Sequence, residues 1–138
     1  IVNNICLFFL SPVIGRAIAR FGERAVLTVE YAGLLGVFLV YAFSDNAALV
    51  TIAYVVDHVL FSFAIAITTF FQKIADARDI APSMAVGFTI NHIAAVALPA
   101  LGGFLWMVDY RIPFVGGAFL ALLSLLAVQF IPAPEPLQ

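Results

Sequence analysis

Charge is scarce in this sequence. Only 10% of the 138 residues are charged, whereas 64% are hydrophobic, and the mean hydropathy is +1.14. A soluble domain of this length needs more polar side chains to cover its surface. The composition therefore excludes an ordinary soluble domain. It predicts an all-α membrane protein whose main partner is the lipid bilayer.

Cysteine and the usual enzyme signatures are also nearly absent. The single cysteine, Cys6, cannot form a disulfide within the chain. There is no Cys/His metal-ligand spacing, no HExxH, no Gly-x-Ser-x-Gly and no P-loop. We therefore expect no enzyme, no metal, no cofactor and no nucleic-acid partner. No basic stretch followed by a small-residue cleavage site marks a signal peptide either.

What the chain does have is long apolar runs, and a membrane-spanning helix needs about 20 such residues. Five runs are predicted as helices: Ile1–Ile14, Ala25–Phe43, Ala47–Phe71, Ser83–Val108 and Pro113–Ile131. The first is too short to cross a hydrocarbon core of about 30 Å, and we expect it to be the end of a longer helix. One helical bundle (1–131) and a cytoplasmic tail (132–138) are predicted.

Short connections are expected at residues 44–46 and 81–83, where polar residues and Pro82 interrupt the apolar pattern. Pro113 fits the first turn of the last helix, where its missing N–H costs little. Within the fourth segment, Pro99 predicts a bend.

Basic residues are distributed unevenly among the connections. Five of the six fall in the first and third connections: Arg16, Arg20, Arg24, Lys73 and Arg78. Only Arg111 falls on the other side. The positive-inside rule then makes the first and third connections and the C-terminus cytoplasmic. We expect a multi-pass protein of the cell (inner) membrane.

The first connection also carries a spaced pattern of glycine and arginine. Gly15, Arg20, Gly22 and Arg24 follow the order Gly-x4-Arg-x-Gly-x-Arg. Glycine permits positive φ, so we expect tight turns at Gly15 and Gly22. The arginines can reach the carbonyl ends of neighbouring helices. Membrane topology alone would also explain arginines here, and both interpretations stay open.

In this register the sequence resembles the major facilitator superfamily, whose signature is Gly-x3-Asp-(Arg/Lys)-x-Gly-(Arg/Lys)-(Arg/Lys). It departs at Ala19, where the family has aspartate, and at Glu23, where the family has a base. Residues 75–106 are similar to helix eleven of this superfamily and to the loop between its helices ten and eleven. The resemblance implies helices eight (in part) to twelve of a twelve-helix fold. It further implies a missing N-terminal half of the same chain that forms the other wall of a central cavity.

Several ionisable side chains lie inside the predicted spans, where they usually face a bundle interior or an aqueous cavity. Asp57 and His58 lie about 15 Å from one boundary, and His92 lies at a similar depth from the other. We expect Asp57, His58 and His92, with Asn91 and Thr89 nearby, to form part of a substrate or proton site. The alternative is that Asp57 or His58 hydrogen-bonds Asn91 or His92 and merely joins two helices.

Other polar residues favour simpler roles. Glu30 is expected to extend toward Arg24 or Arg20 near the membrane boundary. At 100° per residue, four polar side chains of the third segment share a direction: Thr51, His58, Ser62 and Thr69. Small residues four apart in the fourth segment predict close helix packing: Ser83, Gly87, Asn91 and Ala95.

Together these features predict a secondary active transporter that moves a small molecule by alternating access, with protons as a candidate coupling ion. The alternative function is a non-transporting membrane scaffold that packs through its small-residue faces. The substrate stays open because related transporters move chemically unrelated solutes.

Overall fold

The computed structural model describes residues 2–131 of the chain, with side chains described from residue 12 onward. Regular structure in this part is entirely helical: α1 (Val2–Phe43), α2 (Ala47–Phe61), η1 (Ser62–Ala64), α3 (Ile65–Ile74), α4 (Ala77–Val108) and α5 (Arg111–Val128). Four stretches are long and apolar enough to cross a membrane: Pro12–Phe43, Ala47–Ile74, Ala77–Val108 and Arg111–Val128. An all-helical, multi-pass membrane protein is therefore supported. The predicted tail, 132–138, lies outside the described residues.

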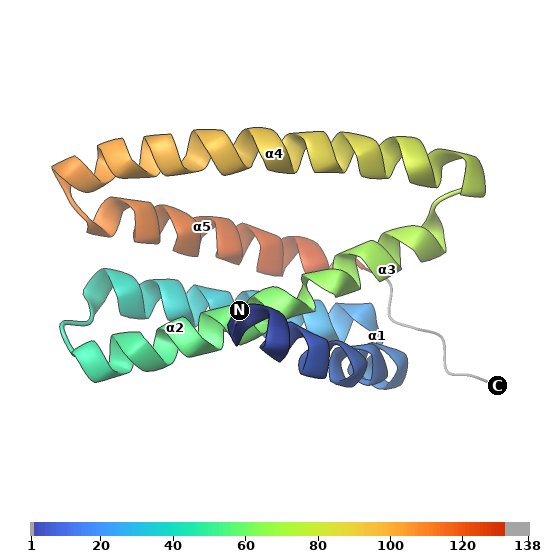
Figure 1. Cartoon of the computed structure of the whole chain (residues 1–138), viewed down its shortest axis with the longest axis horizontal. Helices are drawn as coiled ribbons and strands as arrows, with labels where there is room; N and C mark the ends of the chain where they lie inside the picture. Colours follow the sequence, from blue (N-terminus) through green and yellow to red (C-terminus); the bar gives the residue numbers. More distant parts are fainter. Residues whose placement is uncertain (1, 132–138) are drawn as a thin grey trace.

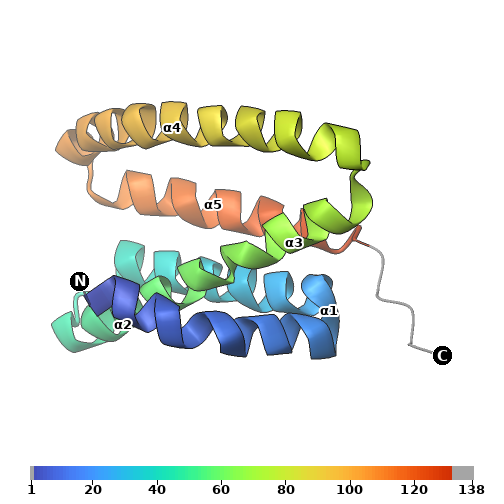
Figure 2. The ribbon, with the colours of Figure 1, turned by 45° about the vertical axis from the view of Figure 1, so that its right-hand side comes forward.

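Helix α1 is interrupted at Gly22, whose φ of 79° and ψ of 162° are not helical. The residues before it form a first arm (2–21) and those after it a second arm (23–43). The two arms run side by side in opposite directions (Figures 1 and 2). The predicted loop between these two segments is thus reduced to a single residue. Helices extend this far because backbone groups in lipid must be hydrogen-bonded within the protein.

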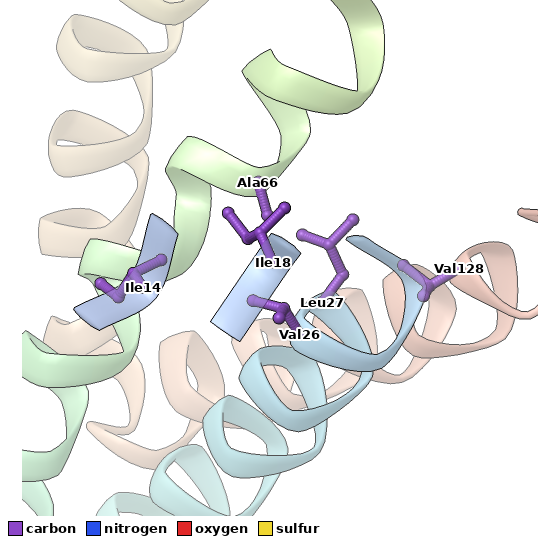
Figure 3. Close-up of a cluster of buried hydrophobic side chains, with 6 residues drawn as sticks. All are labelled: Ile14, Ile18, Val26, Leu27, Ala66 and Val128. Atoms are coloured by element: carbon purple, nitrogen blue, oxygen red, sulfur yellow. The ribbon is translucent and has the colours of Figure 1, made fainter. Parts of the chain in front are cut away.

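The two arms pack against each other through apolar side chains on either side of Gly22. Figure 3 shows the cluster, to which α3 and α5 each add one residue: Ile14, Ile18, Val26, Leu27, Ala66 and Val128. Ile14 and Leu27 are almost completely buried. This cluster joins four parts of the chain at one end of the bundle.

Helices α2 and α3 correspond to the single predicted segment Ala47–Phe71, with the 3-10 turn η1 between them. Asn46 caps the start of α2, because its Oδ1 accepts hydrogen bonds from the N–H groups of Ala48 and Leu49 at 3.0 and 3.3 Å. The predicted connection at residues 44–46 is therefore confirmed. Both α2 and η1 pack against α1.

Helix α5 lies between α4 and the α1–α2 layer (Figure 1). It packs extensively against α1, whereas α4 packs mainly against α5 and has no buried residue among those described. An apolar groove of about 730 Å³ lies between α1, α4 and α5. Its lining includes Leu98, Gly102 and Gly116.

The predicted start of the fourth segment was wrong. Helix α4 begins at Ala77, so Pro82 lies inside it rather than in a connection. Proline removes one backbone hydrogen bond and disfavours the helical conformation only at the residue before it. One lost bond near a helix end is outweighed by the need to satisfy all other backbone groups in lipid. The helix also continues without a break through Pro99.

Charged side chains identify which helix ends lie together. Lys73, near the end of α3, forms an ion pair with Glu23 beside Gly22. The first and third connections therefore share one end of the bundle, as predicted. The connections 44–46 and 109–110 lie at the opposite end (Figure 1).

Candidate functional site

A pocket of about 500 Å³ lies between α1, α2 and α5, and it contains Asp57 on its wall. We call it the Asp57 pocket, and six residues line it: Tyr41, Val50, Thr51, Tyr54, Asp57 and Phe114. Its volume falls within the roughly 300–1,000 Å³ of small-molecule sites. It lies toward the end of the bundle that carries connections 44–46 and 109–110.

Helix periodicity explains why four neighbours along α2 face the same pocket. Tyr54 lies about one helical turn before Asp57, and Val50 lies about two turns before it. These side chains therefore lie on one face of α2. Asp57 is half-buried there. No side chain within residues 12–131 forms an ion pair or hydrogen bond with its carboxylate. The pocket wall therefore carries an uncompensated negative charge when Asp57 is ionised.

Aromatic rings from three helices line the same pocket as this carboxylate. The ring centroids of Tyr41 and Phe114 lie 5.2 Å apart, and Phe114 also contacts Trp106 edge-on at 5.5 Å. The hydroxyl of Tyr41 is buried without a hydrogen-bond partner among the described residues. A buried hydroxyl without a partner is costly, and this group keeps unused hydrogen-bonding capacity in the pocket wall.

His58 lies next to Asp57 but is turned back toward its own helix. Its Nδ1 lies 3.0 Å from the carbonyl oxygen of Tyr54, and its ring lies 4.2 Å from that of Tyr54. Because a carbonyl oxygen only accepts, Nδ1 donates in this contact.

Most of the predicted polar arc is satisfied within the helix. The hydroxyls of Thr51, Ser62 and Thr69 each donate to a backbone carbonyl three or four residues earlier, at 2.8, 3.3 and 3.0 Å. The 3-10 turn at η1 also changes the angular spacing, so Ser62 is buried while Thr51 is exposed. The four polar side chains do not form one continuous face.

The structure does not bring the α4 candidates to Asp57. His92, Asn91 and Thr89 are exposed on α4, and α5 separates that helix from α2 (Figure 2). His92 contacts its own helix, with Nδ1 3.0 Å from the Phe88 carbonyl oxygen, and the Thr89 hydroxyl donates to Ala85 at 2.9 Å. The expected hydrogen bonds between the two helices are therefore not formed. A role for each residue in transport stays a prediction.

The glycine–arginine pattern contains one turn, at Gly22, and is otherwise helical. The turn predicted at Gly22 is confirmed by its positive φ, whereas Gly15 lies within a regular part of the first arm and the predicted turn there was wrong. Arg24 donates from Nη2 to Oε1 of Gln129, just beyond α5, at 3.2 Å. Arg20 instead lies over the ring of Phe21, 5.2 Å from its centroid.

Two glutamates of α1 behave differently from expectation. Glu23 occupies a position where the family signature has a basic residue. Its carboxylate forms an ion pair with Lys73 of α3. Glu30 is only 4% exposed, and its Oε2 has no hydrogen-bond partner among the described residues. The expected extension of Glu30 toward Arg24 was wrong, because Arg24 is bound to Gln129 at the end of α5.

Sequence analysis identified Asp57 but missed Tyr41, Tyr54 and Phe114. Tyr54 could have been found, because a residue three positions before Asp57 shares its helix face. Tyr41 and Phe114 could not, since they belong to α1 and α5 and only helix packing brings them to the pocket.

The sequence matches no protein-family model and no curated protein. Function is therefore inferred from the Asp57 pocket, the helix ends and the buried carboxylates described above.

Proposed function

We propose that this chain is part of a transmembrane transporter that moves a small molecule by alternating access. The observation that carries the proposal is the position of Asp57. Its carboxylate lies about 15 Å along its span, near the middle of a hydrocarbon core of about 30 Å, and borders a pocket. Charged groups at that depth are costly and commonly mark substrate or ion pathways.

The architecture that we propose is the C-terminal part of a major facilitator superfamily carrier. Gly22 turns the chain sharply at the place where the family signature has glycine, and Arg24 binds at the end of α5. An N-terminal half of the same protein would supply the opposite wall of the cavity. The two halves would then rock about a midplane site.

We propose that the protein lies in the cell (inner) membrane. The Gly22 end of the bundle then faces the cytoplasm. Five of the six basic residues lie at or near this end, which agrees with the positive-inside rule. In this orientation the Asp57 pocket lies nearer the outer face.

Protons are the coupling ion that the polar residues favour. Asp57, His58 and His92 are ionisable residues inside the apolar spans, and chains of such residues commonly relay protons in membrane transporters. Sodium would need several oxygen ligands in one place. The described lining of the Asp57 pocket offers side-chain oxygens from Asp57, Thr51, Tyr41 and Tyr54.

A scaffold without transport activity is the second candidate function, because the small-residue face of α4 is open. Ser83, Gly87, Asn91 and Ala95 are all exposed, and a Cβ added at Gly87 would meet no atom within 4 Å. Such a face allows a second helix to approach closely.

Counterflow in proteoliposomes distinguishes the two functions. The intact protein is reconstituted, vesicles are loaded with unlabelled amino acids, sugars, organic anions or organic cations, and uptake of the matching labelled solute is followed. We expect one class to accumulate. Asp57→Asn should reduce that accumulation at least tenfold at equal protein content, whereas Asp76→Asn, the same change at the opposite end, should not.

Each result decides between the functions. Accumulation that survives Asp57→Asn would remove Asp57 from the transport site. If no class accumulates with folded protein in the vesicles, the scaffold function is favoured. His92→Ala tests the second histidine in the same way, with membrane abundance as the control for a structural role.

A further inference from the structure

We propose that the Asp57 pocket binds the positively charged head of an organic ammonium compound, held between the Asp57 carboxylate and the rings of Tyr41, Tyr54 and Phe114. The inference builds on the proposed function, since it names the substrate class of the same site. It rests on the charge of the pocket, its aromatic wall and the small number of oxygen ligands.

The charge of the pocket selects a cation. Asp57 is the one acidic residue among the described lining residues, and none of them is a lysine or arginine. The nearest basic residue along α5, Arg111, is held elsewhere, with its Nε donating to the Tyr110 hydroxyl at 3.2 Å. An anion would therefore meet only repulsion, whereas a cation would pair with a carboxylate that has no partner of its own.

The connections at this end of the bundle are also acidic. Asp45 and Asp109 lie in these two connections, and Arg111 is the base beside them. Acidic groups at one end of a protein raise the local concentration of cations there. The basic residues gather at the opposite end, where Glu23 pairs with Lys73.

The wall of the pocket suits an organic cation. Three of the six lining residues are aromatic, and the Tyr41 and Phe114 rings lie 5.2 Å apart at 49° to each other. Aromatic faces attract ammonium groups within about 6 Å of the ring centroid, most strongly where water is excluded. The unpartnered Tyr41 hydroxyl adds one hydrogen-bonding group for an N–H donor.

Oxygen ligands are too few for a small metal cation. Calcium prefers six to eight oxygens and magnesium six. Among the described residues, the lining offers the Asp57 carboxylate, two phenols and the Thr51 hydroxyl. One carboxylate with aromatic neighbours instead matches a cation whose charge is spread over carbon-bearing groups.

Equilibrium binding with a matched pair of probes tests the inference. The intact protein is placed in nanodiscs of zwitterionic lipid, and binding of tritium-labelled benzyltrimethylammonium is compared with that of phenylmethanesulfonate, a similar shape with the opposite charge. We expect saturable binding of the cation alone. Asp57→Asn should weaken it at least tenfold and Phe114→Leu several-fold, whereas Asp57→Glu should retain most of the affinity.

Two controls localise the binding. Asp76→Asn should leave the affinity unchanged, because Asp76 lies at the other end of the bundle. Trp106 is the single tryptophan of the sequence and contacts Phe114, so binding of the cation should alter the tryptophan emission. Each variant is accepted only if its circular dichroism and gel-filtration profile match those of the wild type.

Three results would overturn the inference: equal binding of the sulfonate, unchanged cation affinity in Asp57→Asn, or no saturable cation binding by folded protein. Failure of this inference is separable from failure of the proposed function. Asp57-dependent counterflow of a sugar or an organic anion would leave the transporter in place and exclude the ammonium class. Cation binding without any counterflow would keep the pocket and exclude transport.

Discussion

Glu23 and Lys73 form an ion pair that joins the Gly22 hairpin to the end of α3. The carboxylate is largely buried, with its side chain 9% exposed, whereas the Lys73 side chain is 64% exposed. Fifty residues separate these two positions in the sequence. Together with the apolar cluster that includes Ile18 and Ala66, the pair holds the first and third connections at one end of the bundle.

We expect Glu23→Lys to destabilise the protein, because it places a base against Lys73 and leaves the buried position without its partner. With one partner exposed, the coupling energy should be about 1 kcal/mol, between the values for surface and buried pairs. The double variant Glu23→Lys, Lys73→Glu should recover part of the loss. Thermal unfolding in detergent, analysed as a double-mutant cycle, measures this. A coupling energy near zero would contradict the role of the pair.

Gly33→Ala should destabilise the contact between α1 and α2. A Cβ at Gly33 would lie 2.6 Å from Cδ1 of Leu60, so either the leucine or the helix must shift. We expect a loss of about 1–3 kcal/mol, as for other overpacked interiors. Gly36→Ala is the matched control, because nothing lies within 4 Å of a Cβ there. Equal melting temperatures for the two variants would show that the helices do not approach closely at Gly33.

Glu30→Gln should stabilise the protein. The carboxyl group of Glu30 is buried and its Oε2 has no partner among the described residues, and an uncompensated charge in low dielectric is costly. The amide has nearly the same shape without that charge, and we expect a gain of about 1 kcal/mol. Asp45→Asn, in an exposed connection, should have almost no effect. If Glu30→Gln instead lowers the melting temperature, the carboxylate has a stabilising partner. Loss of transport without loss of stability would assign Glu30 to function.

Opposite ends of the bundle should differ in access from outside the cell. In a Cys6→Ser background, Asp45→Cys should react with a membrane-impermeant maleimide in intact cells, because it lies at the end that we place outside. Asp76→Cys should react only after the cells are permeabilised. The reverse labelling pattern would show that the orientation is opposite to the one we propose, with the same fold. Labelling of both sites in intact cells would contradict a membrane-embedded bundle.

The sequence allowed several elements to be predicted because they depend on local properties. The turn at Gly22 follows from the freedom of glycine at positive φ, and the start of α2 follows from the capping oxygen of Asn46. Both features were accessible because each depends on residues within one turn of the helix.

Predictions that depend on the surroundings of a helix are less successful. The sequence predicts a boundary at Pro82, yet α4 passes through it, because a helix in lipid cannot leave backbone groups without partners. The sequence predicts Glu30 near Arg24, but that arginine binds Gln129 after α5. It predicts His92 near Asp57, but α5 lies between α4 and α2 (Figure 1). For Glu30 and His92, the position of another helix decided the result.

The sequence by itself determined the class of this protein and the number of its apolar segments, because hydropathy and charge are read residue by residue along the chain. It also singled out Asp57, since a carboxylate in the middle of an apolar run is unusual wherever the helices lie. Only the tertiary structure decided that Tyr41 and Phe114 join Asp57 in one pocket. Those contacts depend on how helix surfaces fit, as at Gly33 and Leu60, and lipid provides no hydrophobic driving force that would reveal such pairings in the pattern of apolar residues.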